Sequence, residues 1–292
     1  MTSTMTPLFK KALLKADEVR MQLGLNMFQP VNIYDVCAKL GVTVRFVDIS
    51  MEGFYTKQED GTYPTILLSN QRPLPRRSYT CAHEFGHHVF GHGLKVDALF
   101  DGTGQTTSFD PDELLVDAFA GALLMPVAGI EAAFTKRKWA PKTASPLDFY
   151  TVCSSFGVGY QTLVNHCRAN QIISETTAMV LLKATPKKMF ASLFPAGTEN
   201  AHFKIIDKHS KSPVVDLEVS NYIVLPADVE VEGDHLRKQQ ATVFGTGYVA
   251  VRPGIVRAAA PDGSMGVFVR IQNFQYAGLA ENRHLENAID EL

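Results

Sequence analysis

The sequence predicts an α+β protein built from three successive regions. Residues 1–128 combine apolar residues at helical spacing with short β-branched runs, and residues 129–177 hold short helical patterns. Residues 178–292 alternate apolar and polar residues between Pro-rich and Gly-rich turns, as β-strands do. A chain of 292 residues is long enough for about two hydrophobic cores. We therefore expect a first domain, a small helical unit and a β-rich domain with these boundaries.

The first region begins with helices and continues into a small sheet. Apolar residues recur three or four positions apart over residues 7–24, which predicts an amphipathic helix. A second helix over residues 32–41 is expected to stop at Gly41. Three short strands follow, and the last two are expected to form a hairpin through the turn Glu59-Asp60-Gly61. Apolar and β-branched runs place these strands at residues 42–47, 53–55 and 65–68.

A metal-binding pattern follows the sheet. Residues 83–87 are His-Glu-Phe-Gly-His, which matches the H-E-x-x-H pattern of zinc hydrolases. The flanking apolar residues predict a helix, so His83 and His87 share one face and can bind one cation. Zinc in such a site keeps a position open for water and lowers its pKa to about 7, and Glu84 would take the proton of that water. The alternative is an ordinary helix whose histidines are exposed or hydrogen-bonded.

A second helix supplies a third ligand. The run over residues 110–125 is so apolar that most of the helix should be buried, with Asp110 as its cap. Glu113 and Asp117 share one face of it, and like charges four residues apart repel by about 0.2–0.5 kcal/mol unless a cation lies opposite. We expect Glu113 to bind the metal and Asp117 to accept the outward N–H of one ligand histidine. Alternatively, Asp110 and Glu113 form a capping box, which leaves Asp117 unexplained.

Two further histidines are weaker candidates as ligands. His92 lies five residues after His87, whereas the three-histidine pattern needs a spacing of six, a position that Gly93 occupies. His88 points about 100° away from His87 around the helix, so we expect it to lie at the surface or to support the site. The predicted ligand set therefore stays two histidines and one glutamate.

The chain resembles the ImmA/IrrE family of metallopeptidases through an ordered set of landmarks over most of its first 175 residues. These landmarks are residues 30–33, 40–42, 66–70, 76–80, 82–84 and 119–126. The resemblance implies a zincin-like fold with His83, His87 and Glu113 as zinc ligands and Glu84 as catalytic base. It also implies an endopeptidase that cleaves an Xre-type helix-turn-helix repressor and so activates stress-response, DNA-damage or mobile-element genes. Manganese or another divalent ion could replace zinc.

The second region resembles a helix-turn-helix unit. A capping-box pattern opens a helix at Ser145, and Gly157 separates it from a second helix over residues 160–170. Arg168 is the one Lys or Arg of that second helix, whereas Lys and Arg contacts to phosphates usually dominate DNA affinity. We favour a structural or protein-contact role, with DNA binding as the alternative. The basic stretch 136–142 before it is interpreted as a solvated linker.

The third region shows β-strand patterns without a catalytic constellation. We expect strands at residues 214–219, 222–225, 243–251 and 266–271. Its four histidines lie at irregular spacing, so we interpret them as surface residues. Some relatives within the resembled family carry a sensor-like domain here, which implies a GAF-like fold with an unknown ligand. Docking of the substrate is the alternative role.

Composition narrows the class of protein. The formal net charge is −2, so the chain as a whole has no strong attraction to nucleic acid or to an anionic membrane. The four cysteines are scattered, which argues against a disulfide framework. We see neither a signal peptide nor a run of roughly 20 apolar residues, and we expect a cytoplasmic protein. A non-catalytic regulatory module that binds a repressor or DNA is the alternative function.

Overall fold

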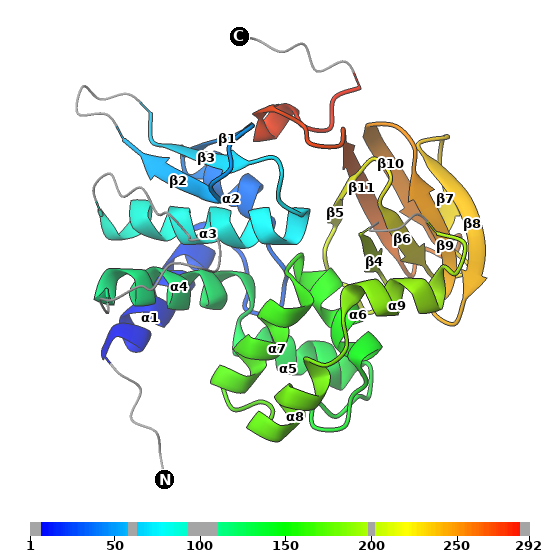
Figure 1. The fold of residues 1–292 in the computed structure, drawn as a ribbon, viewed down its shortest axis with the longest axis horizontal. Helices are drawn as coiled ribbons and strands as arrows, with labels where there is room; N and C mark the ends of the chain where they lie inside the picture. Colours follow the sequence, from blue (N-terminus) through cyan, green and yellow to red (C-terminus); the bar gives the residue numbers. More distant parts are fainter. Residues whose placement is uncertain (1–6, 58–62, 93–109, 198–201, 287–292) are drawn as a thin grey trace. The chain divides into compact units, whose positions relative to one another are not determined.

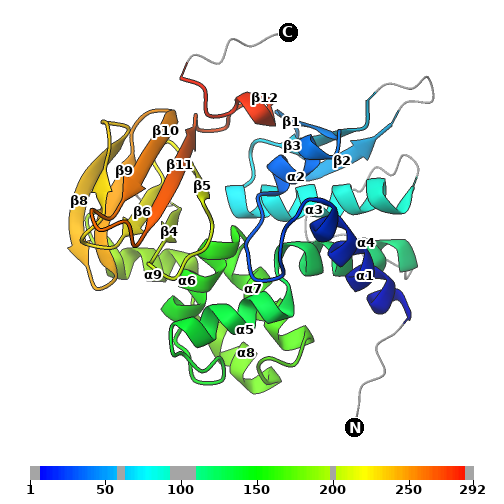
Figure 2. The ribbon, with the colours of Figure 1, turned by 180° about the vertical axis from the view of Figure 1, so that it is seen from behind.

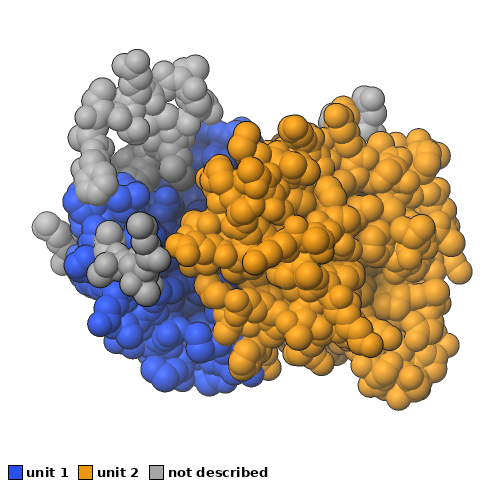
Figure 3. All heavy atoms as spheres, turned by 90° about the horizontal axis from the view of Figure 1, so that it is seen from below, with its two compact units in different colours: residues 1–27, 31–126, 277–281 blue, residues 28–30, 127–276, 282–292 orange. Residues whose placement is uncertain are grey.

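The computed structural model describes residues 7–57, 63–92, 110–197 and 202–286 of the chain (Figure 1). The fold is mixed α+β, as predicted. The chain divides into two compact units, coloured separately in Figure 3. Unit 1 comprises Met1–Met27, Val31–Pro126 and Ala277–Glu281, and unit 2 comprises Phe28–Pro30, Val127–Tyr276 and Asn282–Leu292. The predicted division into three domains stays a prediction, and the helical and β-rich regions share one compact unit.

Unit 1 consists of a small sheet and packed helices. The strand order is β12-β1-β3-β2, with β1 parallel and β2 antiparallel to β3. Helix α3 packs against the sheet and against α4, and α1 covers α4 (Figures 1 and 2). The helices are α1 (Pro7–Gln22), α2 (Ile33–Lys39), α3 (Leu74–Phe90) and α4 (Pro111–Leu124). The strands are β1 (Thr43–Val47), β2 (Gly53–Thr56), β3 (Thr65–Ser69) and β12 (Gly278–Leu279).

The sheet of unit 1 contains one strand that the sequence did not predict. The predicted hairpin is confirmed as β2 and β3, whereas its turn, Glu59-Asp60-Gly61, lies outside the described residues. Strand β12 pairs antiparallel with β1, with Leu279 opposite Arg45. A strand of two residues is too short to show an alternating pattern. Unit 1 therefore includes a segment from near the end of the sequence.

Arg20 joins α1 to the end of α4. Its side chain is buried and donates to the carbonyl oxygens of Leu123 and Asn26, each at 2.6 Å. Burial lowers the pKa of Arg20 to about 10, although Asp17 acts in the opposite direction. Arg20 thus stays cationic at neutral pH and binds the negative end of the α4 dipole.

Unit 2 begins with helices whose ends the sequence largely specifies. Ser145 and Asp148 form the predicted capping box of α6, and Gly157 ends that helix with a φ of 69°. Helices α6 and α7 pack against each other, as expected for two adjacent short helices. That they form a helix-turn-helix unit stays a prediction. We expected β structure from residue 178, but helices α8 and α9 occupy this part of the chain and the first described strand after them begins at Phe203. The bounds are α5 (Val127–Lys136), α6 (Pro146–Phe156), α7 (Tyr160–Ala169), α8 (Glu175–Leu181) and α9 (Pro186–Leu193).

The β-rich part of unit 2 forms two four-stranded sheets, with orders β5-β11-β10-β7 and β4-β6-β9-β8. Buried apolar residues from both sheets form one hydrophobic cluster, as in a β-sandwich. The expected GAF-like fold is not confirmed. The strands are β4 (Phe203–Ile205), β5 (Val214–Glu218), β6 (Tyr222–Leu225), β7 (Glu230–Val231), β8 (Leu236–Thr242), β9 (Gly245–Ala250), β10 (Gly254–Ala259) and β11 (Gly266–Gln272).

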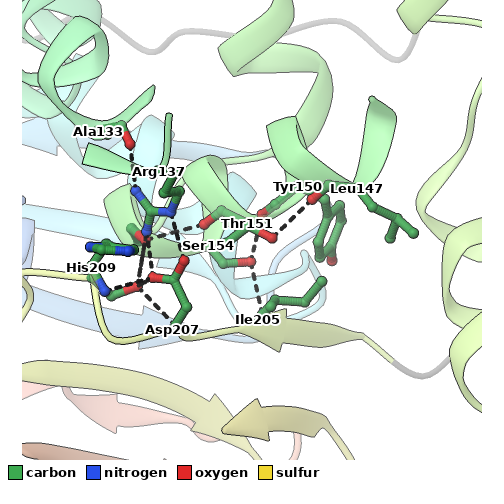
Figure 4. A network of polar contacts seen from close by, with 11 residues as sticks. Ala133, Arg137, Leu147, Tyr150, Thr151, Ser154, Ile205, Asp207 and His209 are labelled. Atoms are coloured by element: carbon green, nitrogen blue, oxygen red, sulfur yellow. Dashed lines mark hydrogen bonds and ion pairs between the residues drawn. The ribbon is translucent and has the colours of Figure 1, made fainter. Parts of the chain in front are cut away.

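Arg137 centres a polar network in unit 2 (Figure 4). Its guanidinium donates to both carboxylate oxygens of Asp207, at 2.7 and 2.6 Å, and to the Ala133 carbonyl oxygen at 2.8 Å. Ser210 also donates to Asp207, at 3.1 Å. Arg137 is buried, so the interpretation of residues 136–142 as a solvated linker is wrong at this position. The bidentate pair joins the end of α5 to the loop after β4.

One described stretch, Pro111–Lys136, is long and apolar enough to cross a membrane by length and composition alone, with a mean hydropathy of 1.7 over an 18-residue window. The expectation that no stretch approaches this length is therefore wrong. However, 61% of its apolar window is buried inside the protein. Within unit 1, α4 packs against α1 and α3, which fits a core helix.

The cysteines all lie in described segments as buried residues, and none forms a disulfide. Burial raises the pKa of Cys153 and of Cys167 to about 12. These two thiols are therefore neutral and poor nucleophiles at physiological pH.

Replacing Asp207 with Asn should lower the free energy of unfolding at pH 7 by about 3 kcal/mol, because Arg137 loses its charged partner while buried. Burial by itself would raise the pKa of Asp207, but the hydrogen bonds and charge of Arg137 bring it below its ordinary value. The wild-type carboxylate therefore stabilises the protein above about pH 4, and this contribution is lost as the pH falls further. Urea unfolding at pH 7 and pH 3 tests both effects.

The fluorescence of Trp139 reports on this region, because its ring lies 5.7 Å from the Arg137 guanidinium. The exposed Asp228 provides a control in the same unit, and Asp228→Asn should change stability by less than about 0.5 kcal/mol. If the free energy of unfolding of the wild type exceeds that of Asp207→Asn by as much at pH 3 as at pH 7, the assigned role of the carboxylate is contradicted.

Candidate metal centre

Helix α3 carries the H-E-x-x-H residues in its last two turns and ends at Gly91. Gly91 adopts a left-handed φ of 71°, and its N–H donates to the His88 carbonyl oxygen at 3.1 Å. The next N–H, of His92, donates to the His87 carbonyl oxygen at 2.9 Å. These two bonds form a Schellman motif, in which a glycine ends the helix and reverses the chain. The predicted helix and its stop are therefore confirmed.

Two histidines of α3 and one glutamate of α4 converge. His83 Nε2 lies 3.2 Å from one carboxylate oxygen of Glu113, and His87 Nε2 lies 3.7 Å from the other. One potential ligand atom from each residue lies within 4.8 Å of the others. Two imidazole nitrogens and one carboxylate oxygen form a donor set typical of catalytic zinc sites. The residues present therefore fit a divalent metal of this kind.

Glu84 lies next to these ligand candidates on α3. The residue is completely buried, at 0% exposure. Burial of a carboxylate is costly without hydrogen bonds or a nearby cation, so a buried Glu at this position is unusual for a purely structural helix. Its place in the motif and its burial make it the candidate proton acceptor of the site.

Asp117 contacts the outer nitrogen of His83. The distance from His83 Nδ1 to Asp117 Oδ1 is 2.8 Å, so His83 presents opposite ring nitrogens to Glu113 and Asp117. However, the Asp117 side chain is 55% exposed and that of Glu113 is 31% exposed. The expected cost of burying both charges is therefore much smaller than the sequence argument assumed. The evidence that Asp117 orients His83 is therefore the contact between them, and not the burial of Asp117.

His92 also contacts the site, and sequence reasoning missed this contact. His92 Nδ1 lies 3.0 Å from His87 Nδ1, and His92 Nε2 lies 3.6 Å from Asp112 Oδ1. The signal that could have found it is Gly91, because a Schellman motif commonly packs the residue after the glycine against the residue five positions earlier. The spacing test considered His92 only as a direct ligand.

His88 lies away from the ligand group, as the helical geometry predicts. Its Nδ1 is 2.9 Å from the hydroxyl of Tyr55 on β2, and its ring stacks on Phe85. Burial lowers the pKa of His88, and Lys57 lowers it further. His88 therefore connects α3 to the sheet as a neutral side chain at physiological pH.

The approach of α3 to α4 depends on Gly86. A Cβ atom at this position would lie 2.9 Å from Val116 Cβ and 3.2 Å from Phe119 Cδ1. Real side chains do not pack so closely, so only glycine fits here without a shift of the helices. The small residue between the two histidines thus allows the carboxylates of α4 to reach α3.

The fold and donor set define a class of protein in which an H-E-x-x-H helix and a glutamate from a neighbouring helix can hold a divalent metal, as in metallopeptidases. Residues 37–168 match the model of the peptidase M78 family, described as the IrrE N-terminal-like domain. This segment of the chain belongs to that family, which confirms the resemblance recognised in the sequence. It contains α3, α4 and all residues of the candidate metal centre.

Other comparisons are weaker. A solved structure of a Mycobacterium tuberculosis transcriptional regulator is similar at 15% identity, over 55% of this chain and 46% of that one, with a TM-score of 0.35. The chain thus spans about half the length of that protein, and a TM-score this low supports no functional argument. The curated proteins gave no match.

Replacing Glu113 with Gln should weaken zinc binding by more than 100-fold, because a charged ligand is lost. Asp117→Asn should weaken it by about 10–100-fold, the range for groups that orient a ligand. Zinc affinity is measured by competition with a chelator, with the exposed Glu131→Gln as control. Wild-type affinity in the Glu113 variant would exclude Glu113 as the third ligand.

Replacing Gly86 with Ala should destabilise the protein by about 1–3 kcal/mol through overpacking against Val116. The effect should appear despite the better helix propensity of Ala, worth about 1 kcal/mol. Thermal unfolding of the metal-free protein tests this. A variant as stable as the wild type would show that the helices can separate freely at this contact.

Proposed function

We propose that the protein is a zinc-dependent endopeptidase. The observation that carries the proposal is the convergence of His83, His87 and Glu113 beside the buried Glu84. When bound by these residues, zinc would supply Lewis-acid chemistry, which polarises a peptide carbonyl and lowers the pKa of water. Membership of residues 37–168 in a peptidase family supports the same reaction.

The side chains have distinct tasks in the proposed reaction. Glu84 accepts a proton from the attacking water and returns it to the amine that leaves when the peptide bond breaks. Asp117 holds the ring of His83 in one orientation through the 2.8 Å contact. A buried carboxylate is well suited to this transfer, because few other water molecules can take the proton that Glu84 has accepted.

The proposed substrate is a helix-turn-helix repressor of the Xre type. This proposal rests on the family to which residues 37–168 belong and on the resemblance that extends through the first 175 residues. Cleavage of such a repressor in the cytoplasm would activate stress-response, DNA-damage or mobile-element genes. DNA binding by the region of α6 and α7 is the less favoured role, because α7 contains one Lys or Arg, Arg168.

Unit 2 is proposed to regulate the peptidase or to dock its substrate. A pocket in this unit, lined by Lys136, His209 and Lys211 among others, has a volume of only about 20 Å³. That volume holds about one water molecule, so this pocket does not accommodate a metabolite as it stands.

Replacing Glu84 with Gln should abolish cleavage while zinc binding stays near the wild-type level, because the amide cannot accept the proton. The assay incubates purified protein with the helix-turn-helix protein encoded beside its gene and follows fragments by mass spectrometry. Glu131→Gln, on the exposed face of α5, is the control and should cleave normally. Full repressor inactivation by the Glu84 variant in cells would favour a non-catalytic binding module.

A further inference from the structure

We propose that His92, held by Asp112, is a positioning residue that orients His87 toward the metal. This inference rests on the proposed metal site, and it concerns His87, because Asp117 contacts the other ligand histidine, His83. It assigns the two ligand histidines separate supports from α4: Asp117 for His83, and Asp112 through His92 for His87.

The end of α3 brings His92 to this place. Gly91 reverses the chain, and the His92 N–H bonds to the carbonyl oxygen of His87 itself. The side chains of these two residues therefore meet, with ring centroids 5.2 Å apart. The His92 ring also stacks on Phe90, at 5.9 Å and an interplanar angle of 26°. Backbone and ring contacts together restrict the orientation of His92.

The hydrogen-bond geometry specifies where the protons lie. His87 directs Nε2 toward Glu113, at 3.7 Å, and Nδ1 toward His92, at 3.0 Å. A metal needs the Nε2 lone pair, so a neutral His87 carries its proton on Nδ1 and donates it to His92 Nδ1. His92 then carries its own proton on Nε2, which faces Asp112 Oδ1 at 3.6 Å. The His87 donor thus has an acceptor at hydrogen-bond distance, whereas the His92 donor faces a carboxylate slightly beyond that distance.

Three carboxylates of α4 contact different nitrogen atoms of the three histidines. Glu113 faces both ligand histidines, Asp117 contacts the outer nitrogen of His83, and Asp112 contacts the outer nitrogen of His92. The side chain of His92 is 13% exposed, whereas that of Asp112 is 49% exposed. His92 therefore extends the reach of a surface carboxylate to a buried imidazole.

The geometry favours a positioning role over a fourth metal ligand. His92 contacts Nδ1 of His87, the nitrogen opposite to the one that faces Glu113. Among the described residues, the group with converging ligand atoms is His83, His87 and Glu113, without His92. Groups that support a ligand in this way typically change metal affinity by about 10–100-fold when removed.

The test compares two replacements of His92 in the full chain. His92→Phe keeps the stacked ring and loses the acceptor, whereas His92→Asn places an amide oxygen where Nδ1 accepted. We expect zinc affinity to fall about 10–100-fold in the Phe variant and to recover substantially in the Asn variant. His88→Phe, in the last turn of α3, is the matched control and should bind zinc like the wild type, because His88 contacts Tyr55 instead.

Two further readouts separate positioning from stability. Nitrogen-15 NMR of the metal-free protein should show His87 protonated on Nδ1 in the wild type and in the Asn variant, and a lower Nδ1–H population in the Phe variant. Thermal unfolding of the metal-free proteins should be similar for all three. If the Phe variant does not fold, the Asn variant and the wild-type tautomer still decide the question.

Different outcomes overturn different proposals. If the wild type binds zinc and His92→Phe binds it equally well, or if His92→Asn is as weak as His92→Phe, the positioning role is wrong. An Nε2–H tautomer of His87 in the wild type also overturns it. If Asp112→Asn leaves zinc affinity unchanged, Asp112 has no part in the support. A wild type that binds no zinc overturns the metal site and hence the proposed peptidase.

Discussion

The close approach of α3 to α4 at Gly86 is the contact on which the candidate site depends. A side chain at Gly86 would meet Val116 at 2.9 Å, so glycine sets the separation of the helices. At this separation, Glu113 and Asp117 reach opposite nitrogens of His83, at 3.2 and 2.8 Å. Both helices are rigid elements packed in the core of unit 1, and rigid elements hold ligands more exactly than loops do. The site is therefore a consequence of helix packing.

The sequence predicted the parts of the site that follow from local geometry. Helical spacing alone places His83 and His87 on one face, so the motif sufficed for them. Glu113 was found from its position on an apolar helix, although its exposure of 31% shows that burial was not the decisive reason. His92 was missed because helical spacing no longer applies after Gly91, where the chain reverses. Its contact depends on a turn motif, which the sequence shows only as one glycine.

The fold was likewise predictable where it depends on local sequence signals and unpredictable where it depends on distant partners. Capping residues and amphipathic periodicity located the helices of unit 1 and α6, because these signals lie within each helix. Strand β12 and the burial of Arg137 were not predictable, since both depend on partners far along the chain: Asp207 lies 70 residues from Arg137. Strand β12 also means that a chain ended at residue 177 lacks one strand of the unit 1 sheet. Such a truncation therefore disturbs unit 1 as well as removing the β-rich part of unit 2.

The charges around the candidate site are arranged so that three carboxylates can lie close together on α4. Asp112 and Glu113 lie in the first turn of α4, where the positive end of the helix dipole favours carboxylates. Exposures of 49% for Asp112 and 55% for Asp117 let water screen their mutual repulsion. A divalent cation held by His83, His87 and Glu113 would offset the negative charge of these carboxylates and of Glu84, which is buried beside them.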